Sequence, residues 1–289
     1  MQITDKITVE VSPDTLGVAY MYIKKKTIRF DTLTFKDGSI RVVIDDTDLS
    51  NYRYYKITAY LESMDDLMIV AQLKDVLDRL GEFVFKSLHI TSPIYSRYDR
   101  VMLENKSDGF GSLVYANFIN SLKFDNVILV DCHSEVLLSQ VSNSLEITQA
   151  QTILGLFEGI PTIAPDKGAL KKNPEASLVF NKVRDASTGK ILGVEMLTTD
   201  LKEVDSFVVI DDLCEGGGTF LGVAQEFYEH YSKDVKLNLS VTHGLFTNNA
   251  LPKLLEVFDN IYVYIMKEDV YNSQPEGIKN KLFPQILVK

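Results

Sequence analysis

Short apolar runs that end in polar residues alternate with amphipathic stretches along most of the chain. Two runs, Val127–Val130 and Phe207–Ile210, are unbroken by polar residues and rich in β-branched side chains, which is typical of strands buried on both faces of a parallel sheet. Between Met64 and Leu80 the apolar residues recur at helical spacing and predict an amphipathic helix. Residues 1–60 alternate between polar and apolar positions instead, which predicts strands and hairpins.

The same patterns continue through both halves of the chain. Further strands are predicted at Phe83–Ile90, Ile160–Ala164, Ser177–Phe180, Leu237–Val241 and Ile261–Ile265, and further helices at Ser112–Leu122, Phe220–Tyr231 and Asn249–Phe258. The alternation breaks around Asn143–Thr152, and 289 residues suffice for two domains of ordinary size. We therefore expect an α/β protein with mainly parallel central sheets, divided into an N-terminal domain of residues 1–146 and a C-terminal domain of residues 147–289.

The most polar strand end follows Phe207–Ile210. Two adjacent aspartates come first, where open α/β sheets place their ligands, and a glycine-rich loop then opens a helix. The candidate residues are Asp211, Asp212, Glu215, Gly216, Gly217, Gly218 and Thr219. Glycines let the backbone approach a phosphate, the N–H groups at a helix start attract an anion, and the carboxylates would hold sugar hydroxyls, so the pattern predicts a ribose 5-phosphate site. A flexible strand-to-helix turn is the structural alternative, but it leaves two neighbouring acids to repel each other without a ligand.

Polar groups also follow the other predicted strands. Tyr95–Arg100 contains two arginines that suit bidentate phosphate contacts, although a solvated loop explains this segment equally well. Residues 101–111 are expected to form a mobile loop. Asp131-Cys132-His133 ends the strand after Val127–Val130, and a histidine beside an acid at that place is a candidate for chemistry. Asp166 opens a lysine-rich turn, where a bound anion or a Mg²⁺ complex competes with a capped helix whose basic first turn is solvated.

Three further segments carry polar residues at definite places in the pattern. Phe35–Ser39 contains an Asp-Gly turn signal and predicts a hairpin corner. Lys182 and Arg184 follow Ser177–Phe180 and lead into a polar loop that we expect at Asp185–Lys190. Thr242-His243-Gly244 follows the predicted strand Leu237–Val241.

The composition of the chain indicates which binding partners and which cellular compartment to expect. A formal charge of −10 argues against broad nucleic-acid binding, which depends on neutralising phosphates. No apolar run approaches the ~20 residues of a membrane span, and the two cysteines provide neither a disulfide framework nor a metal-site spacing. We expect a cytoplasmic protein that binds neither membranes nor nucleic acids and acts on small molecules.

Taken in order, these segments resemble the motifs of the ribose-phosphate pyrophosphokinase family, over about residues 30 to 265. The glycine loop resembles the phosphoribosyl-diphosphate loop of type I phosphoribosyltransferases, whose usual form is Asp-Asp-x-x-Asp-Thr-Gly-Gly-Thr. The resemblance implies two fused domains of the Rossmann-like phosphoribosyltransferase type I class, the first binding ATP and the second ribose phosphate. It also implies transfer of the β,γ-diphosphate of ATP to the 1-hydroxyl of ribose 5-phosphate with Mg²⁺, in a homo-oligomer built from dimers and up to a hexamer in size.

The resemblance also assigns roles to residues of this sequence. ATP would be bound by Phe35, Asp37, Ser39, Arg97, Tyr98, Asp99 and Arg100, with the adenine held across a subunit boundary. The catalytic group would be Lys182, Arg184 and His133, and the metal ligands would be His133 and Asp166. The two basic residues would stabilise charge on the transferred diphosphate from a closing loop, the paired aspartates would bind ribose hydroxyls, and the glycine loop would bind the 5-phosphate.

Departures from the family pattern leave alternatives open. Gly216 stands where threonine is usual, which removes a hydroxyl and a side chain from the phosphate pocket and gives room for a larger 5′-substituted ribose such as ADP-ribose. Ser39 and Tyr98 stand where an acid and an amide are usual. A non-catalytic protein associated with such synthetases is a further alternative, which the presence of Lys182 and Arg184 disfavours. A nucleobase phosphoribosyltransferase would need only one such domain.

Overall fold

The structure is a computed structural model that describes residues 1–12, 26–44, 52–80, 84–92, 94–101, 108–184, 191–198 and 204–289. The chain folds as two compact units, one formed by Asp5–Ile147 and the other by Thr148–Lys289 together with Met1–Thr4. The predicted first domain spans residues 1–146, whereas the structure places Met1–Thr4 in the second unit. The reason is that β1 (Gln2–Thr4) pairs in parallel with β16 (Leu282–Val288).

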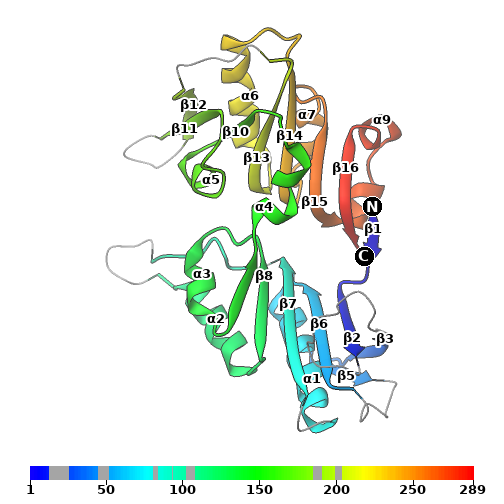
Figure 1. The fold of residues 1–289 in the computed structure, drawn as a ribbon. Coiled ribbons are helices and arrows are strands. Elements are labelled where there is room, and N and C mark those ends of the chain that lie inside the picture. The colour runs from blue at the N-terminus through cyan, green and yellow to red at the C-terminus, as the bar shows by residue number, and fades with distance from the viewer. Residues whose placement is uncertain are drawn as a thin grey trace. The chain divides into compact units, whose positions relative to one another are not determined.

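The N-terminal unit contains a six-stranded sheet in the order β3-β2-β6-β7-β8-β9 (Figure 1). Its strands are β2 (Ile7–Ser12), β3 (Lys26–Ile28), β6 (Tyr54–Tyr60), β7 (Phe85–Ser92), β8 (Asn126–Val130) and β9 (Ser144–Ile147). Strands β6 to β9 run parallel, and β2 and β3 are antiparallel additions. The helices of this unit are α1 (Met64–Leu80), α2 (Gly111–Ser121) and α3 (Glu135–Gln140).

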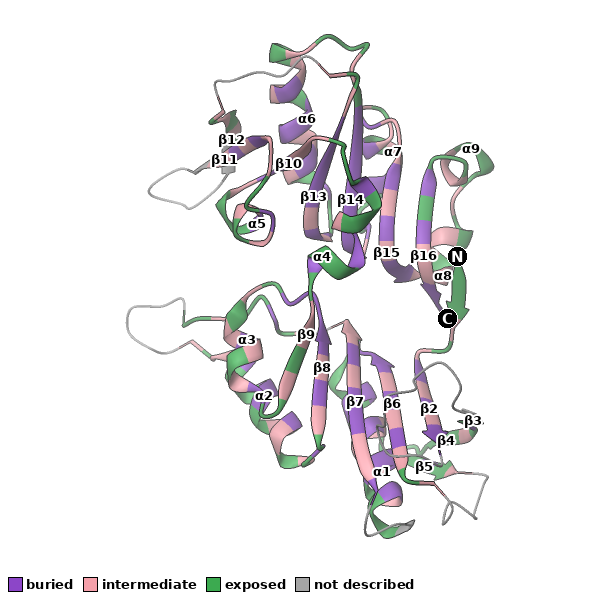
Figure 2. Cartoon of the chain, viewed as in Figure 1, coloured by how far each residue is buried: buried purple, intermediate pink, exposed green. Residues whose placement is uncertain are grey.

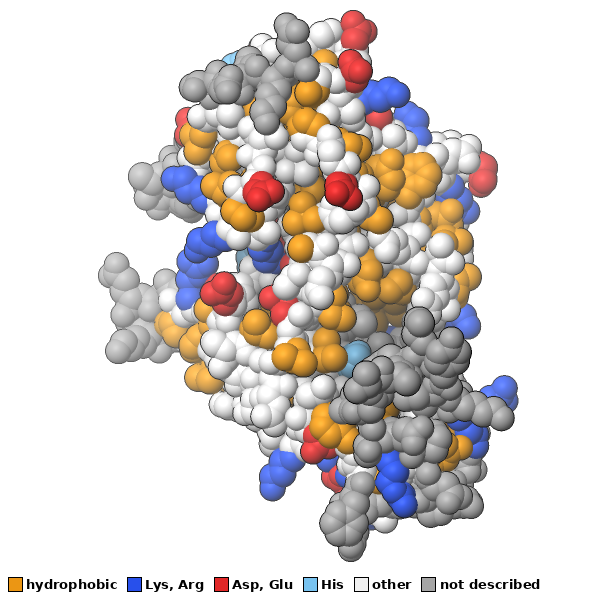
Figure 3. Space-filling view, in the orientation of Figure 1, with side chains coloured by type: hydrophobic (Ala, Val, Ile, Leu, Met, Phe, Trp, Pro, Cys, Tyr) orange, Lys and Arg blue, Asp and Glu red, His pale blue; other side chains and the backbone are white. Residues whose placement is uncertain are grey.

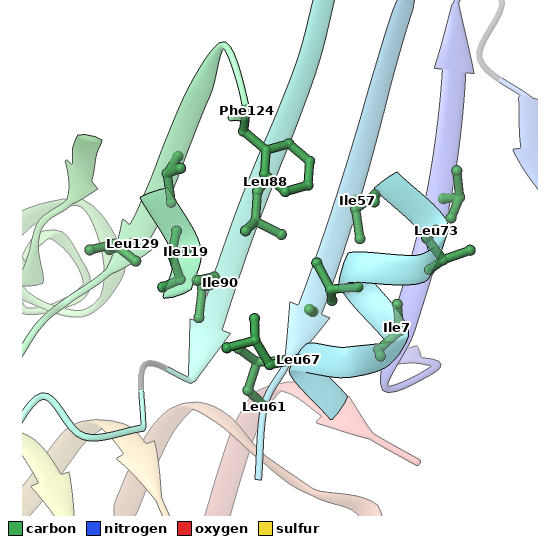
Figure 4. Packing of buried hydrophobic residues seen from close by; sticks show 14 of the residues in the cluster. Ile7, Ile57, Leu61, Leu67, Leu73, Leu88, Ile90, Ile119, Phe124 and Leu129 are labelled. Atoms are coloured by element: carbon green, nitrogen blue, oxygen red, sulfur yellow. The ribbon is translucent and has the colours of Figure 1, made fainter. Parts of the chain in front are cut away.

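Helix α1 has the bounds that its apolar spacing predicts. Its side chains Leu67 and Leu73 are fully buried, and they share one hydrophobic cluster with Ile7 of β2 and Ile57 of β6 (Figure 4). A one-sided apolar stripe on the helix therefore meets the alternating inward residues of the strands, which is the arrangement that stabilises an α/β layer.

A separate two-stranded hairpin, β4 (Phe30–Thr34) and β5 (Ile40–Ile44), confirms the predicted corner at Phe35–Ser39. Gln72 of α1 fastens this hairpin to the unit. Its Oε1 accepts from the Val42 N–H at 3.1 Å, and its Nε2 donates to the Ile40 carbonyl at 2.7 Å.

The C-terminal unit contains an eight-stranded sheet in the order β1-β16-β15-β14-β13-β10-β11-β12. Its remaining strands are β10 (Thr162–Ala164), β11 (Leu178–Arg184), β12 (Ile191–Met196), β13 (Ser206–Cys214), β14 (Lys236–Gly244) and β15 (Ile261–Lys267). Every neighbouring pair is parallel except β11 and β12. The helices are α4 (Gln149–Thr152), η1 (Leu154–Phe157), α5 (Lys167–Lys172), α6 (Gly218–His230), α7 (Ala250–Leu254), α8 (Glu268–Asn272) and α9 (Glu276–Lys279).

Strand β13 is buried on both faces, as its unbroken apolar run predicts (Figure 2). Phe207 and Val209 belong to the cluster that α6 and α7 cover. Val208 and Ile210 point to the opposite side and pack with Ile153 and neighbouring residues of η1. The prediction of an α/β fold with mainly parallel sheets is confirmed, and among the described residues no helix is both long and apolar enough to cross a membrane.

Several predicted elements have different lengths in the structure. Strand β13 continues through Asp211 and Asp212 to Cys214, and β14 continues to Gly244, because the two strands keep pairing beyond their apolar runs. Helix α7 is shorter than the predicted helix and ends at Leu254. The predicted mobile loop at residues 101–111 lies largely outside the described residues, since positions 102–107 are not described.

The resemblance implies a mobile loop for Lys182 and Arg184, and this is wrong, because β11 includes both residues. The polar loop predicted at residues 185–190 lies outside the described residues. The strand pairs with β12 in an antiparallel hairpin, with Lys182 opposite Val194. The polar character of this stretch carries no local sign of the strand. Among the described residues, β10 pairs with β11 only at Leu178 and Val179, so the part of the strand that contains Lys182 has β12 as its paired neighbour. A strand paired on one side does not need an unbroken apolar sequence.

Candidate functional site

The glycine loop leads directly from β13 into α6. Gly217 is the N-cap of the helix and has φ 78°, a left-handed conformation that suits glycine, and a Cβ there would lie 3.2 Å from the Leu254 side chain. No side chain caps α6, a helix whose residues are all described, and Leu221 N–H donates to the Gly217 carbonyl at 3.0 Å. The N–H groups that precede Leu221 in the first turn therefore form the kind of helix terminus that binds anions.

The residues after β14 brace this loop. The N–H groups of Leu245 and Phe246 donate to the Cys214 carbonyl at 2.9 and 3.2 Å, and the Thr247 N–H donates to the Glu215 carbonyl at 3.0 Å. Residues 215, 216 and 218 remain exposed, and a Cβ built on either exposed glycine would meet nothing within 4 Å. The loop is thus held on one side by residues 245–247 and is exposed at residues 215, 216 and 218.

Asp211 and Asp212 lie side by side near the end of β13. The Asp212 N–H donates to Asp211 Oδ1 at 2.9 Å, and Asp212, only 6% exposed, accepts from Lys172 Nζ at 3.1 Å through Oδ2. Burial raises the pKa of Asp211 well above its ordinary value, and the negative charges of Asp212 and Asp166 raise it further. The pair therefore presents one carboxyl group that resists ionisation and one that is held by a lysine.

Asp166 follows β10, the strand between β13 and β11, and is the N-cap of α5. Its Oδ1 accepts from the N–H groups of Gly168 and Ala169 at 2.8 and 3.0 Å, and its Oδ2 accepts from Lys182 Nζ at 2.6 Å. Burial opposes ionisation of this carboxyl, but the Lys182 hydrogen bond and the two backbone N–H groups prevail and lower its pKa. The structure thus brings Asp166 and Lys182 together at the carboxyl ends of adjacent strands, with β13 beside them. Figure 3 shows basic side chains gathered over α5, where Lys167 and Lys171 are exposed.

Replacing Asp211 with Asn is expected to stabilise the protein at neutral pH. The folded state binds a proton more tightly than the unfolded chain here, so stability falls as pH rises from the ordinary aspartate pKa through the raised one. The oxygen of the introduced amide could still accept from the Asp212 N–H, and the pH-dependent loss would disappear. The measurement is the apparent Tm across pH, where each kcal/mol corresponds to about 2–4 °C in a protein of this size. Asp205→Asn, an exposed position just before β13 begins, is the control, and an unchanged Tm profile for Asp211→Asn would contradict the argument.

In the N-terminal unit, Tyr95–Arg100 forms a compact polar turn after β7. The Tyr98 N–H donates to the Tyr95 carbonyl at 3.0 Å, and Tyr95 has a positive φ of 63°. The centroid of the Tyr95 ring lies 5.6 Å from that of the buried Tyr115 ring. Asp99 Oδ1 accepts from Arg100 Nε at 3.0 Å. Burial opposes ionisation, but the hydrogen bond and the charge of Arg100 lower the pKa of Asp99.

His133 is exposed shortly after the end of β8. Asp131, just before it, is buried with φ 42°, and its N–H donates to the Ile147 carbonyl at 2.8 Å. The ends of β7 and β8 therefore meet, as the parallel pairing of these strands requires, and Arg97 and Tyr98 are exposed there.

The hairpin tip holds the remaining nucleotide candidates. Phe35 is 46% exposed, and Asp37 Oδ1 accepts from the N–H and the Oγ of Ser39 at 3.0 and 2.7 Å. The Ser39 hydroxyl contact, together with its backbone N–H, lowers the pKa of Asp37. Ser39 thus orients the Asp37 carboxylate.

The predicted metal ligands belong to different units, His133 to the N-terminal one and Asp166 to the C-terminal one. Within the described residues, no group of three or more His, Cys, Asp and Glu side chains gathers to hold a metal ion. Lys172 is the residue near the site that sequence reasoning missed. Its place in a lysine-rich turn was visible, but its partner Asp212 lies 40 positions further along the chain.

The chain is similar, at low sequence identity, to several known proteins that share one name. No family model matches the chain. The chain is 30% identical over 176 residues to the ribose-phosphate pyrophosphokinase of Sulfurisphaera tokodaii, covering 56% of this chain and 58% of that protein. It is 25% identical over 258 residues to the ribose-phosphate pyrophosphokinase of Hyphomonas neptunium, covering 81% of this chain and 77% of that protein. Phosphoribosylpyrophosphate synthetase from Mycobacterium smegmatis has a similar fold, with a TM-score of 0.64, 18% identity, and coverage of 91% and 86%.

Proposed function

We propose a reaction for this chain from the premise that it is a divergent relative of the ribose-phosphate pyrophosphokinases, the family that its motifs resemble and after which its curated relatives are named. The reaction is transfer of the β,γ-diphosphate of ATP to the 1-hydroxyl of a ribose phosphate, with AMP as the leaving group. The observation that carries the proposal is the open, uncapped terminus of α6 directly after the paired aspartates of β13. A phosphate and adjacent hydroxyls are the groups that such a site complements.

The C-terminal unit would hold the acceptor. The first-turn N–H groups of α6 would bind the 5-phosphate, and Asp211 and Asp212 would bind the ribose hydroxyls. Lys182, whose Nζ lies 2.6 Å from Asp166 Oδ2, would carry positive charge to the diphosphate as its charge develops. Phosphoryl chemistry asks a protein mainly for alignment and charge neutralisation, and these residues offer both.

The N-terminal unit would hold the nucleotide. Arg97 and Arg100 would contact the phosphates, with Asp99 fixing the Arg100 guanidinium through the 3.0 Å contact. Phe35, exposed on the hairpin tip, would stack on the adenine of a neighbouring copy, so a homo-oligomer is part of the proposal.

Magnesium is the cofactor that this chemistry implies. The donor chemistry fits, since Mg²⁺ prefers carboxylate oxygen and needs only one or two protein ligands beside substrate phosphates. Asp166 is ionised and half-buried, which suits it to that role, and His133 is the candidate in the N-terminal unit. When bound, the ion would neutralise phosphate charge.

The acceptor is either ribose 5-phosphate or a larger 5′-substituted ribose such as ADP-ribose. Gly216 favours the second, because a Cβ there would meet nothing within 4 Å and the space in front of the loop is open. The same observation means that a side chain can be introduced at this position without a clash.

Gly216→Thr is expected to shift the acceptor preference towards ribose 5-phosphate. The added hydroxyl can donate to a terminal phosphate, and a hydrogen bond to a charged group contributes about 1.5–3 kcal/mol, or roughly 10- to 100-fold in kcat/KM. The added side chain would also obstruct a 5′-diphosphate. The measurement compares kcat/KM for the two acceptors. Gly216→Ala, which adds volume without the hydroxyl, is the control, and an equal response to both acceptors would reject an enlarged pocket.

One assay tests the function itself. The full chain is incubated with Mg-ATP and each acceptor, and AMP release and the mass of the product are followed. We expect AMP together with a product that has gained two phosphoryl groups at the 1-position. No AMP with any acceptor would favour the non-catalytic alternative.

A further inference from the structure

Lys172 is the last residue of α5 and reaches Asp212 on β13. Its Nζ lies 3.1 Å from Asp212 Oδ2, and the two side chains are only 22% and 8% exposed. Lys167 and Lys171 on the same short helix are exposed, so Lys172 differs from its lysine neighbours in being directed into the protein.

Helix α5 therefore joins two ion pairs of the site. Its N-cap Asp166 accepts from Lys182 of β11, and its final residue donates to Asp212 of β13. Of the three carboxylates in this region, two have a lysine each, while Asp211 accepts the Asp212 N–H at 2.9 Å. Lys172 thus distinguishes Asp212 from its neighbour, although the two residues are adjacent in sequence.

We propose that Lys172 is a positioning residue for the acceptor: it holds Asp212 as an oriented hydrogen-bond acceptor, so that the aspartate pair binds vicinal hydroxyls of a ribose phosphate. This inference rests on the proposed function. A lysine fixes one carboxylate oxygen, so the rotation of the Asp212 carboxyl is restricted before the sugar arrives, and less ordering remains for binding.

An oriented aspartate pair should select sugars that carry both hydroxyls. A buried polar group that loses its partner is costly, so a site arranged for two hydroxyls should reject a sugar that lacks one of them. 2-Deoxyribose 5-phosphate is the corresponding probe. Without Lys172, Asp212 can turn away from the missing hydroxyl, and the discrimination between the two sugars should shrink.

The experiment uses the full-length variants Lys172→Gln and Lys172→Arg, with Lys171→Gln as the matched control on the same helix. Lys172→Gln should raise the Kd for ribose 5-phosphate, measured by calorimetry without ATP, by about 10- to 100-fold, the range for a lost hydrogen bond to a charged group. The acceptor KM should rise with it, while the KM for Mg-ATP stays unchanged. Lys172→Arg should restore most of the affinity, and Lys171→Gln should match the wild type.

A double-variant cycle separates positioning from a purely structural effect. Lys172→Gln leaves a buried carboxylate without its lysine, whereas Lys172→Gln with Asp212→Asn forms an uncharged pair that is safer for folding. If Lys172 acts through Asp212, the double variant should bind ribose 5-phosphate as well as Asp212→Asn does alone. Additive losses, or wild-type acceptor affinity in Lys172→Gln, would overturn the inference. A wild-type protein that neither binds nor uses any acceptor would instead overturn the proposed function.

Discussion

Lys182→Ala is expected to lower kcat by about 10²–10³, the scale for removing one electrostatic donor from a transition state, while the KM for Mg-ATP changes little. The charge of Lys182 should matter most when diphosphate charge develops, and interactions made only then affect kcat rather than KM. Its Nζ contacts Asp166 Oδ2 at 2.6 Å and Lys182 belongs to a strand, so its charge is held beside Asp166 before any substrate binds.

The variant should remain folded, because Asp166 keeps its two backbone N–H partners on α5. Single-turnover AMP formation and steady-state kinetics with saturating acceptor provide the measurement, and Arg184→Ala on the same strand should behave alike. Lys236→Ala is the matched control, since this exposed lysine begins β14, at the end of that strand away from the site. Unchanged turnover in Lys182→Ala would reject the assigned role.

Elements with strong local patterns could be predicted from the sequence. The apolar spacing of α1 determined both of its ends, and the unbroken run in β13 indicated burial on both faces. The resemblance to the ribose-phosphate pyrophosphokinases is confirmed by the names of the curated relatives, and the two-unit α/β architecture agrees with the fold of the synthetase from Mycobacterium smegmatis.

Other features depend on distant partners and could not be predicted. Gln2–Thr4 is a strand only because β16, at the other end of the chain, offers an edge to pair with. Asp211 and Asp212 lie inside β13 because β14 continues beside them, and polar residues in that place carry no local sign of a strand. Lys182 likewise belongs to a strand only because it pairs with β12.

The electrostatics around Asp166, Asp211 and Asp212 also come from the tertiary structure. Three carboxylates close together would repel one another, and two lysines from different elements compensate for two of them. Burial raises the pKa of the third, Asp211, and the negative charges of Asp212 and Asp166 raise it further. If the proposed function holds, this arrangement would keep negative charge near the ribose hydroxyls and positive charge near the diphosphate. A protein with a formal charge of −10 must supply that positive charge locally.

Gly218→Asp is expected to abolish acceptor binding without destabilising the protein. Gly218 is the first residue of α6, and a Cβ there would meet nothing within 4 Å, so the new side chain fits. A carboxylate in the first turn of a helix is favourable by about 0.3–1 kcal/mol, so Tm should stay equal or rise. The same carboxylate would repel a phosphate from the N–H groups of the first turn. Loss of two or more hydrogen bonds of about 1.5–3 kcal/mol each predicts at least ~100-fold weaker binding of ribose 5-phosphate.

Calorimetry with ribose 5-phosphate and thermal unfolding on the same samples provide the two readouts, and their opposite directions distinguish a blocked site from a damaged fold. Gly277→Asp is the matched control, because Gly277 is also an exposed glycine with open space in the first turn of a helix, on α9 beside β16. That variant should change neither acceptor binding nor turnover. ATP affinity should be unaffected in both, since the nucleotide candidates lie in the N-terminal unit. A stable Gly218→Asp protein that still binds ribose 5-phosphate like the wild type would show that the start of α6 is not the phosphate site, because a fixed negative charge cannot share that place with a phosphate dianion.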